Sequence, residues 1–210
     1  FKYVLVPATI LISILTLIAV YLTYSRSALV MLFVGIITFL ILSKKGKLVF
    51  IAVSILTLMI FMSPKSFKTE GTNLLRTVSS EARIVSIKQG FYIFEKNPVF
   101  GVGFNAYRYA QNKYLGLNNI YWKTTHSGAG TDNSFVFVLA TTGIVGFIAY
   151  IYFLYNIFYL SKFNLVKSKY AVVLFSSLLG LLASSFFINS FFYVFILEWV
   201  FILAGLTENN

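Results

Sequence analysis

Six apolar runs, separated by short polar segments and one long polar loop, constrain this sequence more than any other feature. A helix that crosses a bilayer needs about 20 mostly apolar residues. Hydrophobic residues make up 59% of the chain and charged residues 11%, roughly half the charge of a soluble domain. The pattern predicts an all-α, polytopic membrane helix bundle of about six spans. The runs are Val4–Leu22, Ser27–Leu42, Leu48–Met62, Asn133–Leu160, Tyr170–Ile188 and Phe191–Leu206.

The long polar loop, Ser63–Asp132, is the only stretch long and polar enough to hold an active site. We expect residues 1–210 to form one membrane domain, with residues 63–132 as a large helical extracytoplasmic loop. Because the sequence begins at Phe1 and its first apolar run lacks a small-residue cleavage site, we expect it to be part of a longer chain.

The short connections predict how the chain is oriented in the membrane. The segments 43–47 and 161–169 together hold six lysines and no acidic residue, and six spans would place both on one side. The positive-inside rule assigns them to the cytoplasm. The long loop then faces outside. The positive-inside rule is weak for loops longer than about 60 residues, so the charges of this loop do not decide its side.

Composition excludes several classes of function. The net charge of +11 suggests nucleic acid as a partner for a soluble protein, but here the basic residues are scattered among membrane runs. We therefore predict no nucleic-acid binding. The chain has no cysteine, which excludes disulfides and thiolate metal sites. The loop has no acidic cluster of the kind that holds a metal, so we predict no metal site.

The loop itself contains helical patterns. Four apolar residues recur at three- and four-residue spacing and predict an amphipathic helix that ends at Asn97-Pro98 and lies on the outer membrane surface. A second short helix is predicted near Asn105–Tyr114. Between them, Gly101-Val102-Gly103 lacks the Lys-Ser/Thr of a phosphate-binding loop, which favours a tight turn between two helices. The four apolar residues are Ile84, Ile87, Phe91 and Phe94.

Several polar residues on the predicted outer face are candidates for chemistry. Arg26 is either an interfacial snorkelling residue or an anion clamp, because the guanidinium fork binds two phosphate oxygens at once. Arg83 is either a charge that faces solvent or lipid headgroups, or part of the same clamp. Arg108 either contacts lipid headgroups or joins Arg26, Arg83 and Asn133 as a substrate-binding residue.

Asp132 and His126 are the candidate proton acceptors. Asp132 opens the fourth run, where Asp, Asn and Ser all make good helix caps, so a capping role competes with a role as general base. His126 is the only histidine and is either an ordinary loop residue or a second base near Asp132. The candidate catalytic set is therefore Asp132, Arg83 and His126.

Three ordered elements of the sequence resemble the O-antigen ligase and repeat-unit polymerase superfamily. The match covers nearly the whole chain, which resembles the C-terminal half of such proteins. The elements are Tyr24-Ser25-Arg26-Ser27-Ala28; Arg83 with Asn97-Pro98-Val99-Phe100-Gly101-Val102-Gly103; and Asp132-Asn133-Ser134-Phe135 with Gly143-Ile144-Val145-Gly146.

Members of this superfamily transfer glycans from undecaprenyl pyrophosphate on the outer face of the bacterial plasma membrane. The resemblance implies a multi-pass, GT-C-like, metal-independent glycosyltransferase without a cofactor, whose active loop faces the periplasm or the outside. It implies that Arg26 and Arg83 bind the pyrophosphate and stabilise the leaving group. The implied partners are the lipid-linked glycan, the bilayer and a chain-length regulator protein.

One departure from the superfamily bears on the reaction. Ligases carry a histidine where this chain has Asp132, which favours a polymerase that joins repeat units into O-antigen, capsule or exopolysaccharide. The alternative is a ligase that transfers finished glycan to lipid A core or protein, with His126 as the source of the imidazole. A polysaccharide flippase is the third hypothesis, although such proteins usually keep ionisable groups in mid-membrane.

Overall fold

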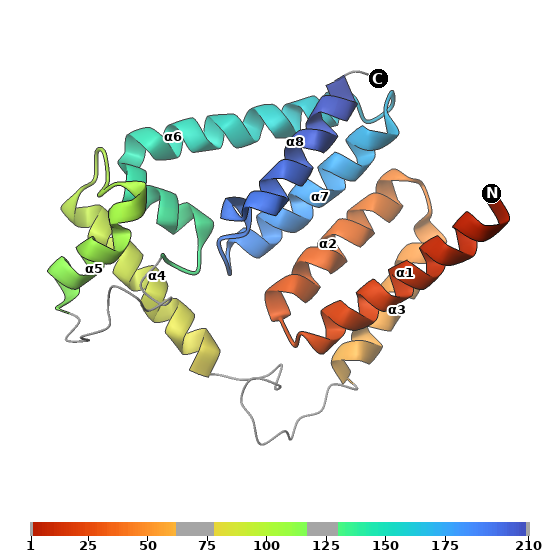
Figure 1. Ribbon diagram of the computed structural model, residues 1–210, viewed down its shortest axis with the longest axis horizontal. Coiled ribbons are helices and arrows are strands. Elements are labelled where there is room, and N and C mark those ends of the chain that lie inside the picture. Colours follow the sequence, from red (N-terminus) through yellow and green to blue (C-terminus); the bar gives the residue numbers. More distant parts are fainter. Residues whose placement is uncertain (1, 62–77, 117–129, 209–210) are drawn as a thin grey trace.

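The computed structural model describes residues 2–61, 78–116 and 130–208, and every regular element in these ranges is a helix (Figure 1). The all-α prediction is therefore confirmed for the described part of the chain. Two single-turn 3-10 helices, η2 (Phe104–Ala106) and η4 (Ser190–Phe192), precede the fifth and eighth α-helices. The α-helices are α1 (Lys2–Leu22), α2 (Arg26–Leu42), α3 (Gly46–Phe61), α4 (Val78–Lys96), α5 (Tyr107–Leu115), α6 (Ser134–Phe163), α7 (Lys169–Ser185) and α8 (Val194–Glu208).

A helix forms at each of the six predicted apolar runs, as α1, α2, α3, α6, α7 and α8. Among the described residues, one helix, α6, is long and apolar enough to cross a membrane by itself. Four other helices are apolar over 10–17 residues. A helix at each of the six runs is confirmed, and a membrane crossing by each of these helices stays a prediction.

Close packing of α2 against α7 forms the centre of the bundle, with α8 alongside α7 (Figure 1). A Cβ atom at Gly180 of α7 would lie 2.6 Å from the Met31 carbonyl oxygen of α2. Small residues at such contacts let helix backbones approach closely, which is how helices associate where no hydrophobic driving force acts between them. Beside this contact, Leu174, Leu178 and Val200 are fully buried between α7 and α8.

The two connections rich in lysine lie at the same end of the bundle. Figure 1 shows the α2–α3 turn and the α6–α7 loop at one end, and the α1–α2 turn and the α7–α8 connection at the other. The two segments therefore lie on the same side of the bundle, and the side of the membrane that they face stays a prediction.

The helix α6 is broken at Gly143, whose backbone angles are φ 65° and ψ −166°. A helix break leaves carbonyl groups before it and N–H groups after it without partners in the helix. The loop after α4 supplies those partners: the N–H groups of Val102 and Gly103 donate to the Ala140 and Thr141 carbonyls, at 3.1 and 2.7 Å. On the other side of the break, two N–H groups donate to the loop's carbonyls: Ile144 to Pro98 at 2.9 Å and Val145 to Val99 at 3.3 Å.

Two glycines make this insertion sterically possible. Gly101 and Gly143 both have left-handed backbones, with φ of 66° and 65°. A Cβ atom at Gly101 would overlap the Thr141 backbone, and one at Gly143 would overlap the Val99 carbonyl. The prediction of a tight turn at Gly101-Val102-Gly103 is confirmed, and the turn also fills the gap in α6.

The α4 helix begins at Val78 and ends at Lys96, as its apolar spacing and Asn97-Pro98 predict. A different face of α4 from the predicted apolar one packs against α6. Ile93 is fully buried, and a Cβ at Gly90 would lie 2.6 Å from the Val136 side chain of α6. Ile84 and Phe91 remain 53% and 44% exposed, so the predicted apolar face points away from α6 and is available to a lipid surface.

The connection between the last two apolar runs is a compact turn. α7 ends at Ser185, η4 follows, and α8 begins at Val194. The Ser184 and Ser190 hydroxyls are 2.5 Å apart, and the Ser134 hydroxyl donates to the Ile188 carbonyl at 3.1 Å. The first bond closes the turn, and the second fastens it to the start of α6.

Replacing Gly101 tests the insertion of the loop into α6. Gly101→Ala combines a left-handed backbone with overlap against Thr141, whereas Gly116→Ala has the same backbone class, with φ of 58°, and open space around it. A left-handed alanine costs about 1–2 kcal/mol. We expect Gly116→Ala to lower the free energy of unfolding by about that amount and Gly101→Ala to lower it by clearly more. Thermal unfolding of the purified protein in detergent measures both, and equal losses would contradict the insertion.

Candidate active site

A cavity of about 470 Å³ opens between the start of α2, the first half of α4 and the residues that follow α7. Arg26 of α2 and Arg83 of α4 both line it, although the apolar helix α3 and the first part of the polar loop separate them in sequence. Both side chains are half-buried. The rest of the lining is Ser27, Val30, Ile84, Ile87, Phe186 and Phe187.

Arg26 is held at the cavity by the N-terminus of α2. Ser25 caps this helix, and its hydroxyl accepts from the Ala28 N–H at 3.4 Å and lies 3.2 Å from the Ser27 hydroxyl. Tyr24, with φ of 50°, makes the tight turn from α1. Arg26 is therefore the first helical residue, where the positive end of the helix dipole adds to its own charge.

The described lining of the cavity holds two guanidinium groups and no carboxylate. Its other walls are almost entirely apolar. An anion that enters such a space exchanges water for directed N–H donors in a medium of lower dielectric constant, which strengthens each charge interaction. Chemically, the cavity suits a phosphate group attached to an apolar chain.

Asp132 lies next to this cavity but does not line it. Its backbone N–H donates to the Ser86 hydroxyl at 3.2 Å, and Ser86 lies one helical turn after Arg83. Asp132 is half-exposed. Residues three apart on a helix share a face, so this bond holds Asp132 beside the part of α4 that carries Arg83.

The alternative reading of Asp132 as the helix cap is wrong. Asn133 caps α6: its side-chain oxygen accepts from the N–H groups of Phe135 and Val136, each at 3.0 Å. The Asn133 amide also donates to the carbonyl of Phe186, a cavity residue, at 3.1 Å. Both functional groups of this buried amide are therefore used within the fold, and its role in substrate binding stays a prediction.

Tyr107 is a buried residue near Asp132 that sequence reasoning missed. It is 1% exposed and packs against the ring of Phe137 at 5.7 Å between centroids. Its hydroxyl has no hydrogen-bond partner among the described residues. Burial, and secondly the negative charge of Asp132, raise the pKa of the phenol well above its ordinary value. The only signal in the sequence is the spacing of Tyr107 and Gln111, four apart on one face of α5.

Two predicted site residues are not part of this arrangement as described. Arg108, on α5, does not line the cavity. The α5 helix instead reaches α4 through Gln111, whose amide donates to Gln89 at 2.9 Å. His126 lies outside the described residues. Within the described ranges, no three His, Asp or Glu side chains gather as metal ligands would.

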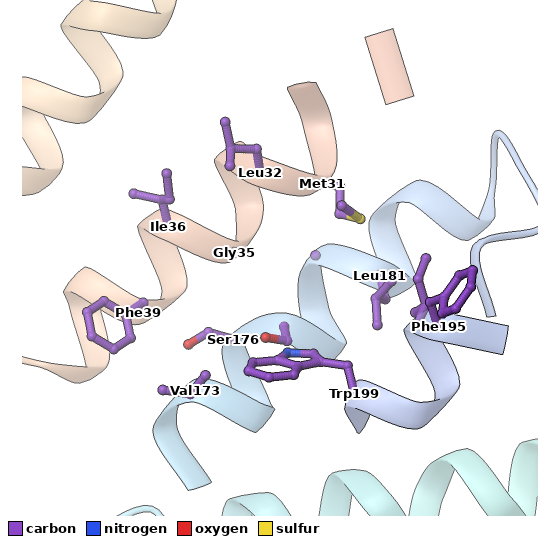
Figure 2. A pocket seen from close by; sticks show the side chains of 13 residues that line it. Met31, Leu32, Gly35, Ile36, Phe39, Val173, Ser176, Leu181, Phe195 and Trp199 are labelled. Atoms are coloured by element: carbon purple, nitrogen blue, oxygen red, sulfur yellow. The ribbon is translucent and has the colours of Figure 1, made fainter. Parts of the chain in front are cut away.

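A second cavity, of about 520 Å³, lies between α2, α7 and α8 (Figure 2). Figure 2 shows the Trp199 indole beside Ser176, with Leu181 and Phe195 further along the same groove. No charged side chain lines it. It therefore offers an apolar surface but no group that would hold an anion.

Replacing Asn133 tests how the start of α6 is fixed. Loss of a helix cap costs about 1 kcal/mol, and Asn133→Ala also leaves the Phe186 carbonyl without its donor. We expect a clear fall in the melting temperature of the purified protein. Asn156→Ala is the control, since Asn156 is exposed and bonds only its own helix at Tyr152. Equal melting temperatures for the two variants would contradict the assigned cap.

Tyr107→Phe separates the phenol's charge from its packing. A buried hydroxyl without a partner is costly, so we expect no loss of stability near pH 7. A raised pKa in the folded state means that the stability contributed by the neutral phenol is fully present below pH 10.0, the ordinary pKa, and is lost as the pH rises above it. Denaturant unfolding above pH 10 should therefore favour Tyr107→Phe over the native protein, and equal losses of stability in the two proteins would contradict the raised pKa.

Comparison with known proteins supports the resemblance seen in the sequence. The O-antigen ligase family model matches residues 11–151, about two thirds of the chain, and this range contains all three resembling elements. Neither the curated proteins nor the solved structures contain a match to the chain. The chain belongs to the O-antigen ligase family.

Proposed function

We propose that this chain is the glycan-transferring part of a membrane polymerase that joins oligosaccharide repeat units carried on undecaprenyl pyrophosphate. The observation that carries the proposal is the cavity in which Arg26 and Arg83, from separate helices, meet with apolar walls. Family membership supports a role in membrane glycan processing. The choice of polymerase and of this carrier is our inference.

The two arginines act on the leaving group. In the transfer, an acceptor hydroxyl attacks the anomeric carbon of the donor sugar, and the bond from that carbon to the pyrophosphate oxygen breaks. The carrier pyrophosphate leaves with the electron pair and gains negative charge. Arg26 and Arg83 donate hydrogen bonds to its oxygens and stabilise that charge most strongly as it develops.

Asp132 takes the proton from the acceptor hydroxyl. The Asp132 backbone is held beside α4 by its N–H bond to the Ser86 hydroxyl, one helical turn after Arg83, and Asp132 does not line the arginine cavity. This geometry supports an arrangement in which the donor pyrophosphate lies in the cavity and the acceptor sugar lies next to Asp132. Arg108 on α5 and His126 remain candidates for contacts with the sugars.

The apolar walls fit the lipid half of the substrate. Val30, Ile84 and Ile87 surround the arginines with hydrocarbon, which suits the first isoprene units attached to the pyrophosphate. Burial of apolar surface contributes about 25 cal/mol per Å². A carrier lipid would therefore bind this cavity through both its pyrophosphate and its hydrocarbon chain.

We place this cavity on the outer face of the bacterial plasma membrane. The lysine-rich connections occupy the opposite end of the bundle (Figure 1), and the positive-inside rule assigns that end to the cytoplasm. The bilayer and the lipid-linked glycan are the partners of the reaction. A chain-length regulator protein is a further partner that fits a polymerase.

A ligase is the second candidate, because the matching family model carries that description. In that case finished glycan passes to lipid A core or to protein. The two candidates differ in what accumulates when the gene is lost. Single repeat units in place of a ladder indicate a polymerase, and long chains stranded on the carrier indicate a ligase.

Substitution of the cavity arginines tests the proposal. In a host lacking the native gene, we expect Arg83→Ala and Arg26→Ala in the full-length protein to reduce polymer by about 10²-fold, the usual scale for losing a charge-stabilising donor. Arg→Lys keeps the charge but loses the two-pronged geometry, so it should restore only part of the activity. Gel separation of surface and carrier-linked glycans gives the readout.

Lys88→Ala is the matched control, because Lys88 is exposed on the same helix and does not line the cavity. Immunoblots of membrane fractions confirm equal insertion of every variant. A full polymer ladder from correctly inserted Arg83→Ala or Arg26→Ala would overturn the assignment of the cavity.

A further inference from the structure

A groove of about 510 Å³ lies at the opposite end of the bundle from the arginine cavity, between the last turns of α6 and the start of α7. Five of its lining residues belong to α6 and one to α7. Its lining is aromatic except for one lysine. The residues are Tyr155, Phe158, Tyr159, Lys162, Phe163 and Phe175.

Three rings on the outward face of α6 form a stacked series along this groove. The rings of Tyr155 and Tyr159 lie 6.1 Å apart at 25°, and those of Tyr159 and Phe163 lie 6.1 Å apart at 19°. All three residues are more than half exposed. Their α6 neighbours Leu154 and Ile157 face the bundle core, so the series lies on the side of α6 that points away from the protein.

Cationic groups gather at the end of this aromatic series. Lys162 lines the groove, and the Lys167 ammonium lies 5.0 Å from the centre of the Phe163 ring. Lys169 begins α7. All three side chains are exposed, and no ion pair links them to a carboxylate in the described part of the chain.

The groove therefore combines an apolar aromatic wall with a cationic rim at the end of the helix that is long enough to cross a bilayer. Tyrosine rings favour the membrane–water boundary because one end is apolar and the other is wet. Lysines just beyond that boundary attract anionic lipids. The same end of the bundle carries Lys44 and Lys45 in the α2–α3 turn (Figure 1).

We propose that this groove binds one anionic phospholipid of the leaflet on the lysine-rich side, with an acyl chain along Tyr155, Tyr159 and Phe163. Lys162 and Lys167 contact its phosphate. The charge complementarity selects a lipid with a net negative headgroup over a zwitterionic one. This site is separate from the arginine cavity, and the proposal is independent of the function proposed above.

The test uses the full-length protein in nanodiscs, with phosphatidylglycerol and phosphatidylcholine as the two probes. Native mass spectrometry after gentle release from the disc counts retained lipids. We expect retention of phosphatidylglycerol over phosphatidylcholine in the native protein. Attraction by surface lysines predicts that Lys162→Gln with Lys167→Gln lowers this preference by about tenfold or more, while Lys→Arg at both positions keeps it.

The matched control is Lys96→Gln with Lys113→Gln. These lysines also lie over aromatic rings, at 5.2 Å from Tyr92 and 5.3 Å from Tyr114, but on the polar loop. The control should keep the full preference. The proposal is overturned if the Lys162/Lys167 pair can be neutralised without effect, if both pairs lose the preference equally, or if glycerol phosphate in solution competes as well as the lipid does.

Discussion

The hydrogen bonds between the loop 97–103 and the broken helix α6 are the interaction on which the rest of the structure depends. Without them, the Ala140 and Thr141 carbonyls before Gly143 and the N–H groups after it would have no partners, a cost of about 1–3 kcal/mol for each buried group. The same bonds fix the C-terminal end of α4 against α6. At the other end of the contact, the Asp132–Ser86 bond fixes the first half of α4. Arg83 therefore reaches the α2 cavity from a helix that is held at two points.

Much of the fold could be predicted because it is encoded locally. The apolar runs give the six helices, Asn97-Pro98 gives the end of α4, and Ser25 before α2 is a common cap. The break in α6 could not be predicted, because Gly143-Ile144-Val145-Gly146 continues an apolar helical pattern. Its reason lies in Pro98 and Val99, whose carbonyls are distant in sequence. The face of α4 that packs against α6 could not be predicted either, since Gly90 allows an approach to Val136 that apolar spacing alone does not reveal.

The candidate site likewise combines features that the sequence predicts with features that depend on contacts between distant residues. Arg26 directly precedes the second apolar run, and Arg83 lies in the loop that follows the third. The predicted topology therefore places both arginines on the same side of the bundle. That Asn133 rather than Asp132 caps α6 depends on one backbone conformation, in which the Asn133 side-chain oxygen accepts from two N–H groups. The position of Tyr107 against Phe137 depends on how α5 packs against α6, which the spacing of Tyr107 and Gln111 on α5 does not specify.

The central claim is that Arg26 and Arg83 together bind the pyrophosphate of a lipid carrier. A double-mutant cycle tests this most directly, using the full-length protein and a short polyprenyl pyrophosphate whose affinity is measured by calorimetry. The account predicts that Arg26→Gln and Arg83→Gln each weaken binding by about tenfold or more, the scale of a charged hydrogen bond. It also predicts that the double variant loses less than the sum of the two free-energy changes, because the residues share one ligand. Strictly additive losses, or unchanged affinity in either single variant, would contradict a shared pyrophosphate site.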